Sequence, residues 1–67
     1  MQDKTKFNVG DKVVIRFQYP FYSENFKEGN VGEVIDVITK WQRPYYYVKV
    51  NNERESFFEE YLEFVDK

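Results

Sequence analysis

The chain has 67 residues, a net charge of −2 and 21% aromatic residues, and it contains no cysteine and no histidine. This length suits one small domain. The two missing residue types exclude disulfides, thiolate or imidazole metal sites, and cysteine or histidine catalysis. We therefore expect no metal, no cofactor and no enzymatic activity, and a core stabilised by rings that each remove roughly 150–250 Å² from water.

Targeting and membrane signals are missing from the printed sequence. Its first residues have no apolar stretch of the kind that signal peptides contain. No apolar run approaches the ~18 residues that a membrane-spanning helix needs. We expect a cytoplasmic protein that has no contact with a membrane.

The chain begins with a polar segment and a first strand. We expect residues 1–6 to be a flexible leader and residues 7–67 to be one domain. Alternating apolar residues over 12–17 predict a half-buried strand. Its inward face would hold Val13, Ile15 and Phe17.

A long connection follows over residues 18–30. Loops of this length are usually functional or disordered. Pro20 disfavours a central strand here. Disorder is disfavoured in turn by four rings, which are Tyr19, Phe21, Tyr22 and Phe26.

The second strand is predicted over residues 31–38, where simple apolar alternation fails. We infer a bend or bulge near Asp36, so that the strand supplies both faces of a curved sheet. Gly32 is typical of a place where one backbone packs closely on another.

The third strand is predicted over residues 45–50, after a loop at 39–44. Alternation places Tyr46 on the inner face and leaves Tyr45 and Tyr47 on the outer face. These outer rings could pair with rings on a neighbouring strand or could contact a ligand.

Asn51 and Asn52 predict a hairpin, because asparagine tolerates positive φ. A two-residue turn would pair Val48 with Glu55 on the inner face, where an unpaired carboxylate is costly. We therefore predict a loop of three or five residues, which would align Val48 with Ser56 or Phe58 instead.

The last segment predicts a short helical turn over 59–62 and a brief closing strand at 64–65. The aromatic core predicted from all these elements consists of Phe17, Tyr46 and Phe58, together with Phe7 and Phe64.

This order of elements resembles the small SH3-like barrels of bacterial and phage proteins. The segments that carry the resemblance are Gly10–Ile15, Gly29–Val34, Tyr47–Val50 and Phe58–Val65. The resemblance implies an all-β, five-stranded barrel with a long first loop and one short 3-10 turn before the last strand. It implies almost nothing about function.

More distant similarities concern two better-known barrels. Tyr19–Tyr22 and Gly32–Val34 are similar to the SH3-like subunit of photosystem I. KOW-type ribosomal barrels are also similar, but their basic surface is missing here. The motifs of signal-transduction SH3 domains are absent, so a proline-rich ligand is not implied.

The leading functional hypothesis is a non-catalytic protein-interaction module with an aromatic groove. In an SH3-like barrel the 18–30 and 39–45 loops would lie beside each other and combine their rings. Rings with polar tips are good binding anchors. The alternative is that the long loop buries its own rings over an open end of the barrel. The partner-binding residues of the hypothesis are Tyr19, Phe21, Tyr22, Trp41, Tyr45 and Tyr47.

Two other functions stay open. One is a barrel that binds single-stranded nucleic acid through Tyr45, Tyr47, Lys40, Arg43 and Lys49, although the sequence pI of about 5.0 weighs against it.

The other is a phage or mobile-element inhibitor that places an acidic C-terminal face in a basic site. That face would consist of Glu53, Glu55, Glu59, Glu60 and Glu63. In each case a monomer or a homodimer is compatible with the sequence.

Overall fold

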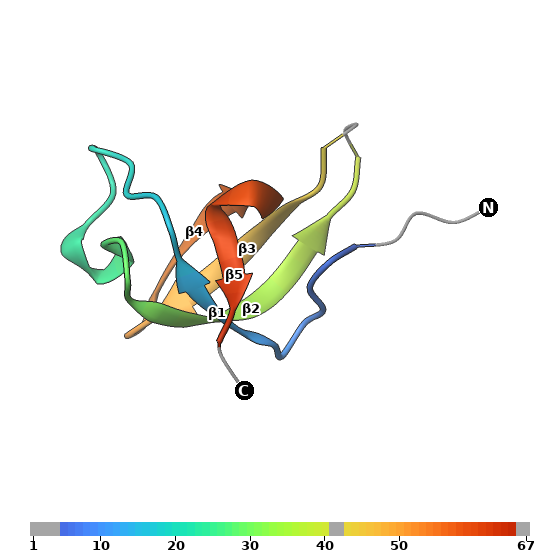
Figure 1. Ribbon diagram of the computed structural model, residues 1–67, viewed down its shortest axis with the longest axis horizontal. Helices are drawn as coiled ribbons and strands as arrows, with labels where there is room; N and C mark the ends of the chain where they lie inside the picture. Colours follow the sequence, from blue (N-terminus) through green and yellow to red (C-terminus); the bar gives the residue numbers. More distant parts are fainter. Residues whose placement is uncertain (1–4, 41–42, 66–67) are drawn as a thin grey trace.

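A computed structural model describes residues 5–40 and 43–65 of the chain (Figure 1). Its five strands are antiparallel neighbours in one sheet, in the order β4-β3-β2-β1-β5. No backbone pairing joins the edge strands β4 and β5, both of which are fully described, so the sheet is open. The all-β prediction is confirmed, whereas closure into a barrel is not. The elements are β1 (Lys12–Ile15), η1 (Glu24–Phe26), β2 (Val31–Ile38), β3 (Tyr45–Val50), β4 (Glu53–Phe58), η2 (Glu59–Tyr61) and β5 (Leu62–Phe64).

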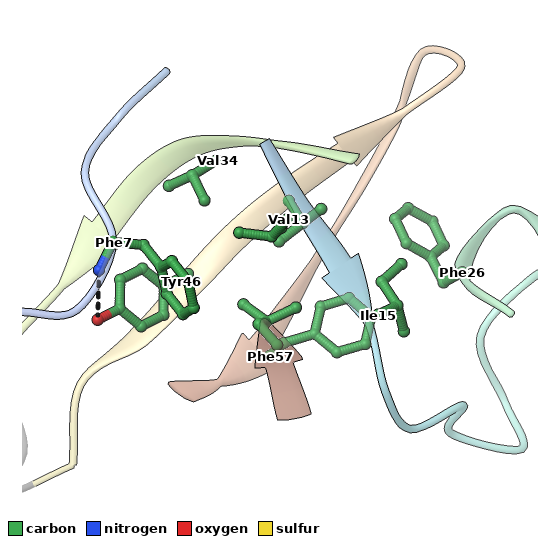
Figure 2. Close-up of a cluster of buried hydrophobic side chains, with 9 residues drawn as sticks. Phe7, Val13, Ile15, Phe26, Val34, Tyr46 and Phe57 are labelled. Carbon is green, nitrogen blue, oxygen red and sulfur yellow. Dashed lines mark hydrogen bonds between the residues drawn. The ribbon is translucent and has the colours of Figure 1, made fainter. Parts of the chain in front are cut away.

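The core lies against one face of this sheet (Figure 2). The strands supply most of its side chains, while Phe7 comes from the N-terminal segment and Phe26 from the long loop. The prediction that Phe7 and Tyr46 are core residues is confirmed. The wholly buried side chains are Phe7, Val13, Ile15, Phe26, Val34, Tyr46, Val48, Phe57 and Leu62.

Strand β1 is shorter than predicted, and this changes the place of Phe17. The long loop returns to the end of the strand, where the Ile15 N–H donates to the Asn30 carbonyl at 2.9 Å. Phe17 therefore lies beyond the strand, is 41% exposed and stacks on the Tyr61 ring at 4.9 Å. Its prediction as a core residue was wrong.

Both irregular features predicted for β2 are present. The register with β3 shifts between Val34 and Asp36, which makes Ile35 the extra residue of a bulge. A side chain at Gly32 would come within 2.8 Å of a Val50 methyl group and 3.0 Å of the Lys49 carbonyl oxygen. Only glycine allows β3 to pack this closely.

The β3–β4 turn has two residues, so the predicted odd-numbered loop was wrong. Asn51 and Asn52 have φ angles of 51° and 75°, as a tight hairpin turn of this length requires. Val50 then pairs with Glu53, and Val48 with Glu55. The predicted cost of burying the Glu55 carboxylate does not arise, because no charged side chain among the described residues is fully buried.

This register also exchanges two neighbouring phenylalanines. A shift of one residue moves every side chain of a strand to its opposite face. Tyr46 pairs with Phe57, which is buried, while Phe58 pairs with Tyr45 and is half-buried on the outer face. The prediction of Phe58 as a core residue was therefore wrong, and Phe57 takes that place.

The N-terminal segment is anchored where the sequence predicted a flexible leader up to residue 6. The Lys6 N–H lies 3.1 Å from the Tyr46 hydroxyl and 3.0 Å from a Glu59 carboxylate oxygen. Tyr46 itself donates to Glu59 at 2.6 Å. Lys6 is therefore hydrogen-bonded to the folded domain, and residues 1–4 of the predicted leader lie outside the described residues.

The C-terminal elements keep their predicted order but differ in extent. A 3-10 turn precedes the last strand, as predicted. Strand β5 begins earlier than expected, so that Leu62 is buried. Phe64 touches the edge of the Phe7 ring at 4.7 Å but is 47% exposed, so its prediction as a core residue was also wrong.

Candidate functional site: an aromatic groove

An open groove of about 310 Å³ lies between the long loop and the outer face of β3 and β4. Five of its seven lining residues are aromatic rings that are only partly buried. The lining residues are Tyr19, Tyr22, Tyr45, Tyr47, Ser56, Phe57 and Phe58.

The floor of the groove comes from the strands. Tyr45 lies opposite Phe58, and Tyr47 lies opposite Ser56, because alternation turns these residues away from buried Tyr46. The centre of the Tyr45 ring lies 6.1 Å from the ring centres of both Tyr47 and Phe58. The outward orientation predicted for the two tyrosines is therefore confirmed.

The wall of the groove is the long loop, which is folded rather than disordered. Phe26 anchors it in the core, and the Ser23 hydroxyl caps the η1 turn by accepting from the Asn25 N–H at 3.3 Å. A Glu53 carboxylate oxygen of β4 accepts from the Ser23 hydroxyl at 2.5 Å and from the Asn25 amide at 2.8 Å. These bonds hold the loop along the sheet and lower the pKa of Glu53.

Tyr22 ties the loop to the edge strand near the middle of the groove. Its hydroxyl donates to the Ser56 carbonyl at 2.8 Å, and its ring meets the Phe57 ring edge-on at 5.4 Å. Since unpaired backbone groups make an edge strand prone to pairing with another chain, this contact also shields β4.

Tyr19 and Phe21 differ sharply although they are close in sequence. Tyr19 is half-buried among the rings of Phe17, Tyr22 and Tyr61, and burial is the main cause that raises its pKa, followed by the Tyr61 phenol. Phe21 stacks on Tyr19 at 5.8 Å but stays 79% exposed. It stands at the rim of the groove with most of its ring in water.

Arg43 lies beside the groove and is already engaged. Its guanidinium group is 4.0 Å from the centre of the Phe58 ring and makes an ion pair with Glu60 at 2.6 Å. Both partners of that pair are about half exposed, so it contributes little to stability. Its effect is to hold a cation over the aromatic floor.

The structure brings together four of the six predicted partner-binding residues, Tyr19, Tyr22, Tyr45 and Tyr47. Phe21 lies at the rim, and Trp41 lies outside the described residues. Ser56, Phe57 and Phe58 were missed. The Asn51–Asn52 pair could have indicated them, because a two-residue turn sets the register that places Ser56 opposite Tyr47 and Phe58 opposite Tyr45.

The geometry of the groove differs from the predicted meeting of two loops. In Figure 1 the long loop extends to the left of the sheet, whereas residues 39–40 and 43–44 lie at the upper right. The long loop meets the strand face instead. The alternative prediction holds for Phe26, which is buried, but not for Phe21.

The predicted acidic face is divided among three elements, and most of its carboxylates have partners within the protein. Glu53 binds the long loop, Glu59 binds Tyr46, and Glu60 pairs with Arg43. Glu63 lies 3.9 Å from Arg16. Glu55, on the inner row of β4, is half-buried.

Residues 5–40 and 43–65 show no cluster of metal ligands and no membrane-spanning helix. No three acidic side chains gather there as metal ligands would, and neither short 3-10 turn is a helix that could cross a membrane. Comparison of the chain with models of known families, with curated proteins and with solved structures finds no match. Inference about function therefore rests on the groove itself.

The Glu53 contacts predict how the loop is held in place. Glu53→Ala removes the acceptor for Ser23 and Asn25, so we expect several-fold faster hydrogen exchange of the loop amides at residues 26–30. Because the pKa of Glu53 is lowered, this stabilisation is present above pH 4.5 and is lost as the pH falls through the lowered value. Protection factors measured by NMR would check both effects.

Glu28→Ala is the control, since it removes an exposed carboxylate from the same loop. Equal effects of the two substitutions would contradict the role of Glu53.

Proposed function

We propose that this protein is a non-catalytic protein-interaction module that binds an extended segment of a partner in the aromatic groove. The observation that carries the proposal is the placing of Tyr19, Tyr22, Tyr45 and Tyr47 around one hollow, with Phe21 79% exposed at its rim. Large rings of this kind are typical anchors of protein interfaces, because they bury much area at a small entropic cost.

The way in which the groove is built supports binding with little rearrangement. The core ring Phe26, the Tyr22–Ser56 bond and the Glu53 bonds hold its wall in place before any ligand arrives. A preformed site loses less entropy on binding than a site that must first be ordered. The open, shallow form of the hollow suits a peptide segment better than an enclosed small molecule.

For the fold, we propose an SH3-like barrel. The supporting observations are five short antiparallel strands, a long folded loop after β1, and a 3-10 turn directly before β5. The β2 bulge bends the strand in the way that a small barrel requires.

Single-stranded nucleic acid is the less favoured ligand. Tyr45 and Tyr47 are available for stacking, but Arg43 already pairs with Glu60, and the net charge of the chain is −2. Nucleic-acid binding relies on a concentrated basic surface.

The test is a selection of random decapeptides displayed on phage against the purified protein. We expect groove-dependent binders whose synthetic peptides bind Phe21→Ala about tenfold more weakly, since a ligand that covers this exposed ring removes apolar area from water worth about 1.5 kcal/mol or more. Fluorescence anisotropy measures the affinity. Because Phe21 is 79% exposed, its removal should leave the thermal melt nearly unchanged.

Val9→Ala is the control, since Val9 is 63% exposed and does not line the groove. It should bind the peptides as the unaltered protein does. A selection that returns no binders, or only binders indifferent to both Phe21→Ala and Tyr47→Ala, would show that the groove is not a peptide site.

A further inference from the structure

The outer face of the sheet changes from aromatic to cationic along β3 and β4. Residues that pair across strands share a face, and the next row on that face lies two positions along each strand. One row holds Tyr45 and Phe58, and the next holds Tyr47 and Ser56. The row nearest the hairpin runs across four strands as Lys12, Glu33, Lys49 and Arg54.

This last row has an excess of positive charge at the β3–β4 end. Glu33 is paired in register with Lys12 on one side and with Lys49 on the other, so the row holds three cations and one carboxylate. Arg54 directly faces Lys49, and like charges in opposed positions destabilise a sheet. All four side chains are exposed.

Neither Lys49 nor Arg54 makes an ion pair within the described part of the chain. The ion pairs among the described residues join Arg16 to Glu63 and Arg43 to Glu60, so no described carboxylate oxygen lies within 4.0 Å of the Lys49 or Arg54 nitrogens. Nearby Asp36 instead accepts from the Val37 N–H at 2.9 Å. An anion bound from outside would relieve the repulsion between the two cations.

Open hollows connect the cationic row with the aromatic groove. Tyr47 lines the groove and also a second hollow, which it shares with Ile35, Asp36 and Arg54. Ile35 and Arg54 in turn line a third hollow together with Lys49, Asn52 and Glu53. The Glu53 carboxylate there already accepts from Ser23 and Asn25 of the long loop. The three hollows therefore follow one another along the strands from Phe58 towards the hairpin.

Resting on the proposed function, we propose that the ligand is an acidic peptide segment in extended conformation. An apolar or aromatic side chain of the peptide lies among Tyr19, Tyr22 and Phe58, and a carboxylate lies between Lys49 and Arg54. Phe58 and Arg54 are four positions apart on β4, which is about 14 Å in a strand. An extended ligand matches this distance with the same spacing of four residues, and both of its side chains then point to the same side.

The spacing can be read from the decapeptides selected on the unaltered protein. We expect an Asp or Glu four positions from an apolar or aromatic residue in the enriched sequences. Replacing that acid by its amide, or moving it by one position, should weaken the binding of synthetic peptides about tenfold, since the charge-assisted contact is lost. Raising the salt concentration should weaken binding as well.

The matched protein variants are Arg54→Glu and Lys27→Glu, which change the net charge equally. Lys27 is exposed on the long loop and does not line any of the three hollows. Arg54→Glu should weaken the binding of the acidic peptides at least about tenfold, and Lys27→Glu should change their affinity less than about twofold. Arg54→Gln, which adds no carboxylate to β4, should have a smaller effect in the same direction if Arg54→Glu impairs folding.

The outcomes separate this inference from the proposed function. Peptides that depend on Phe21 and Tyr47, carry no spaced acid and ignore both Arg54 variants would overturn the inference and leave the groove as a peptide site. Peptides indifferent to Phe21 and Tyr47 would overturn both. Displacement of the peptides by a single-stranded oligonucleotide, with dependence on Arg54, would overturn the acidic-peptide inference in favour of a nucleic-acid ligand.

Discussion

Phe26→Ala is expected to destabilise the protein by about 3–5 kcal/mol, as the removal of a buried ring from a core usually does. Phe26 is wholly buried, and the centre of its ring lies 6.0 Å from the Tyr22 ring centre and 5.9 Å from the Phe57 ring centre. Domains are stable by only about 5–15 kcal/mol, and a chain of this length lies near the low end. The variant should therefore be largely unfolded at room temperature or melt far below the unaltered protein, as followed by circular dichroism.

Phe21→Ala provides the comparison within the same loop. It removes the same ring from a residue that is 79% exposed, so we expect a change within about 0.5 kcal/mol. If both substitutions shift the urea midpoint equally, the loop does not pack as the structure describes.

Tyr46 predicts a loss of stability in alkaline solution. Burial, followed by the hydrogen bond to Glu59, raises the pKa of Tyr46 from 10.0 to about 12. A raised pKa in the folded state means that the stabilisation is present below pH 10 and is lost as the pH rises towards 12, because the unfolded chain ionises first. Two pKa units correspond to roughly 3 kcal/mol.

Tyr46→Phe should remove this part of the alkaline loss, and urea denaturation at pH 8, 10 and 11.5 would measure it. Tyr45→Phe is the control, because that ring faces outward on the same strand. Its free energy of unfolding should fall with pH as steeply as that of the unaltered protein. An unchanged slope in Tyr46→Phe would argue against the buried phenol.

Local patterns in the sequence predicted much of this fold correctly. Alternation in Tyr45–Val50 placed Tyr46 inside and its two tyrosine neighbours outside, and broken alternation located the β2 bulge. Gly32 marked the close approach of β3. These features depend on side-chain direction and backbone sterics within one or two strands, so a single sequence is enough to predict them.

The position of β4 depended on contacts that are distant in the sequence. The sequence assigns a burial cost to Glu53 and Glu55 on the inner face, but in the folded chain Glu53 is exposed, where Ser23 and Asn25 of the long loop bind it, and Glu55 is only half-buried. The exposure of these carboxylates depends on segments distant in the sequence, so the predicted cost was too high. One wrong turn then exchanged Phe57 and Phe58, and with them part of the groove.

The sequence by itself determined that this is an all-β chain, that it has no thiol or imidazole chemistry, and that its rings outnumber what its core can hold. Only the tertiary structure decided which rings those are. Phe21 and Phe26 are the same residue type in the same loop, but one is 79% exposed and the other is wholly buried. The physical reason is that burial depends on what the folded chain places around a side chain, and here η1 and the edge of β4 turn Phe26 inward while they leave Phe21 at the rim of the groove.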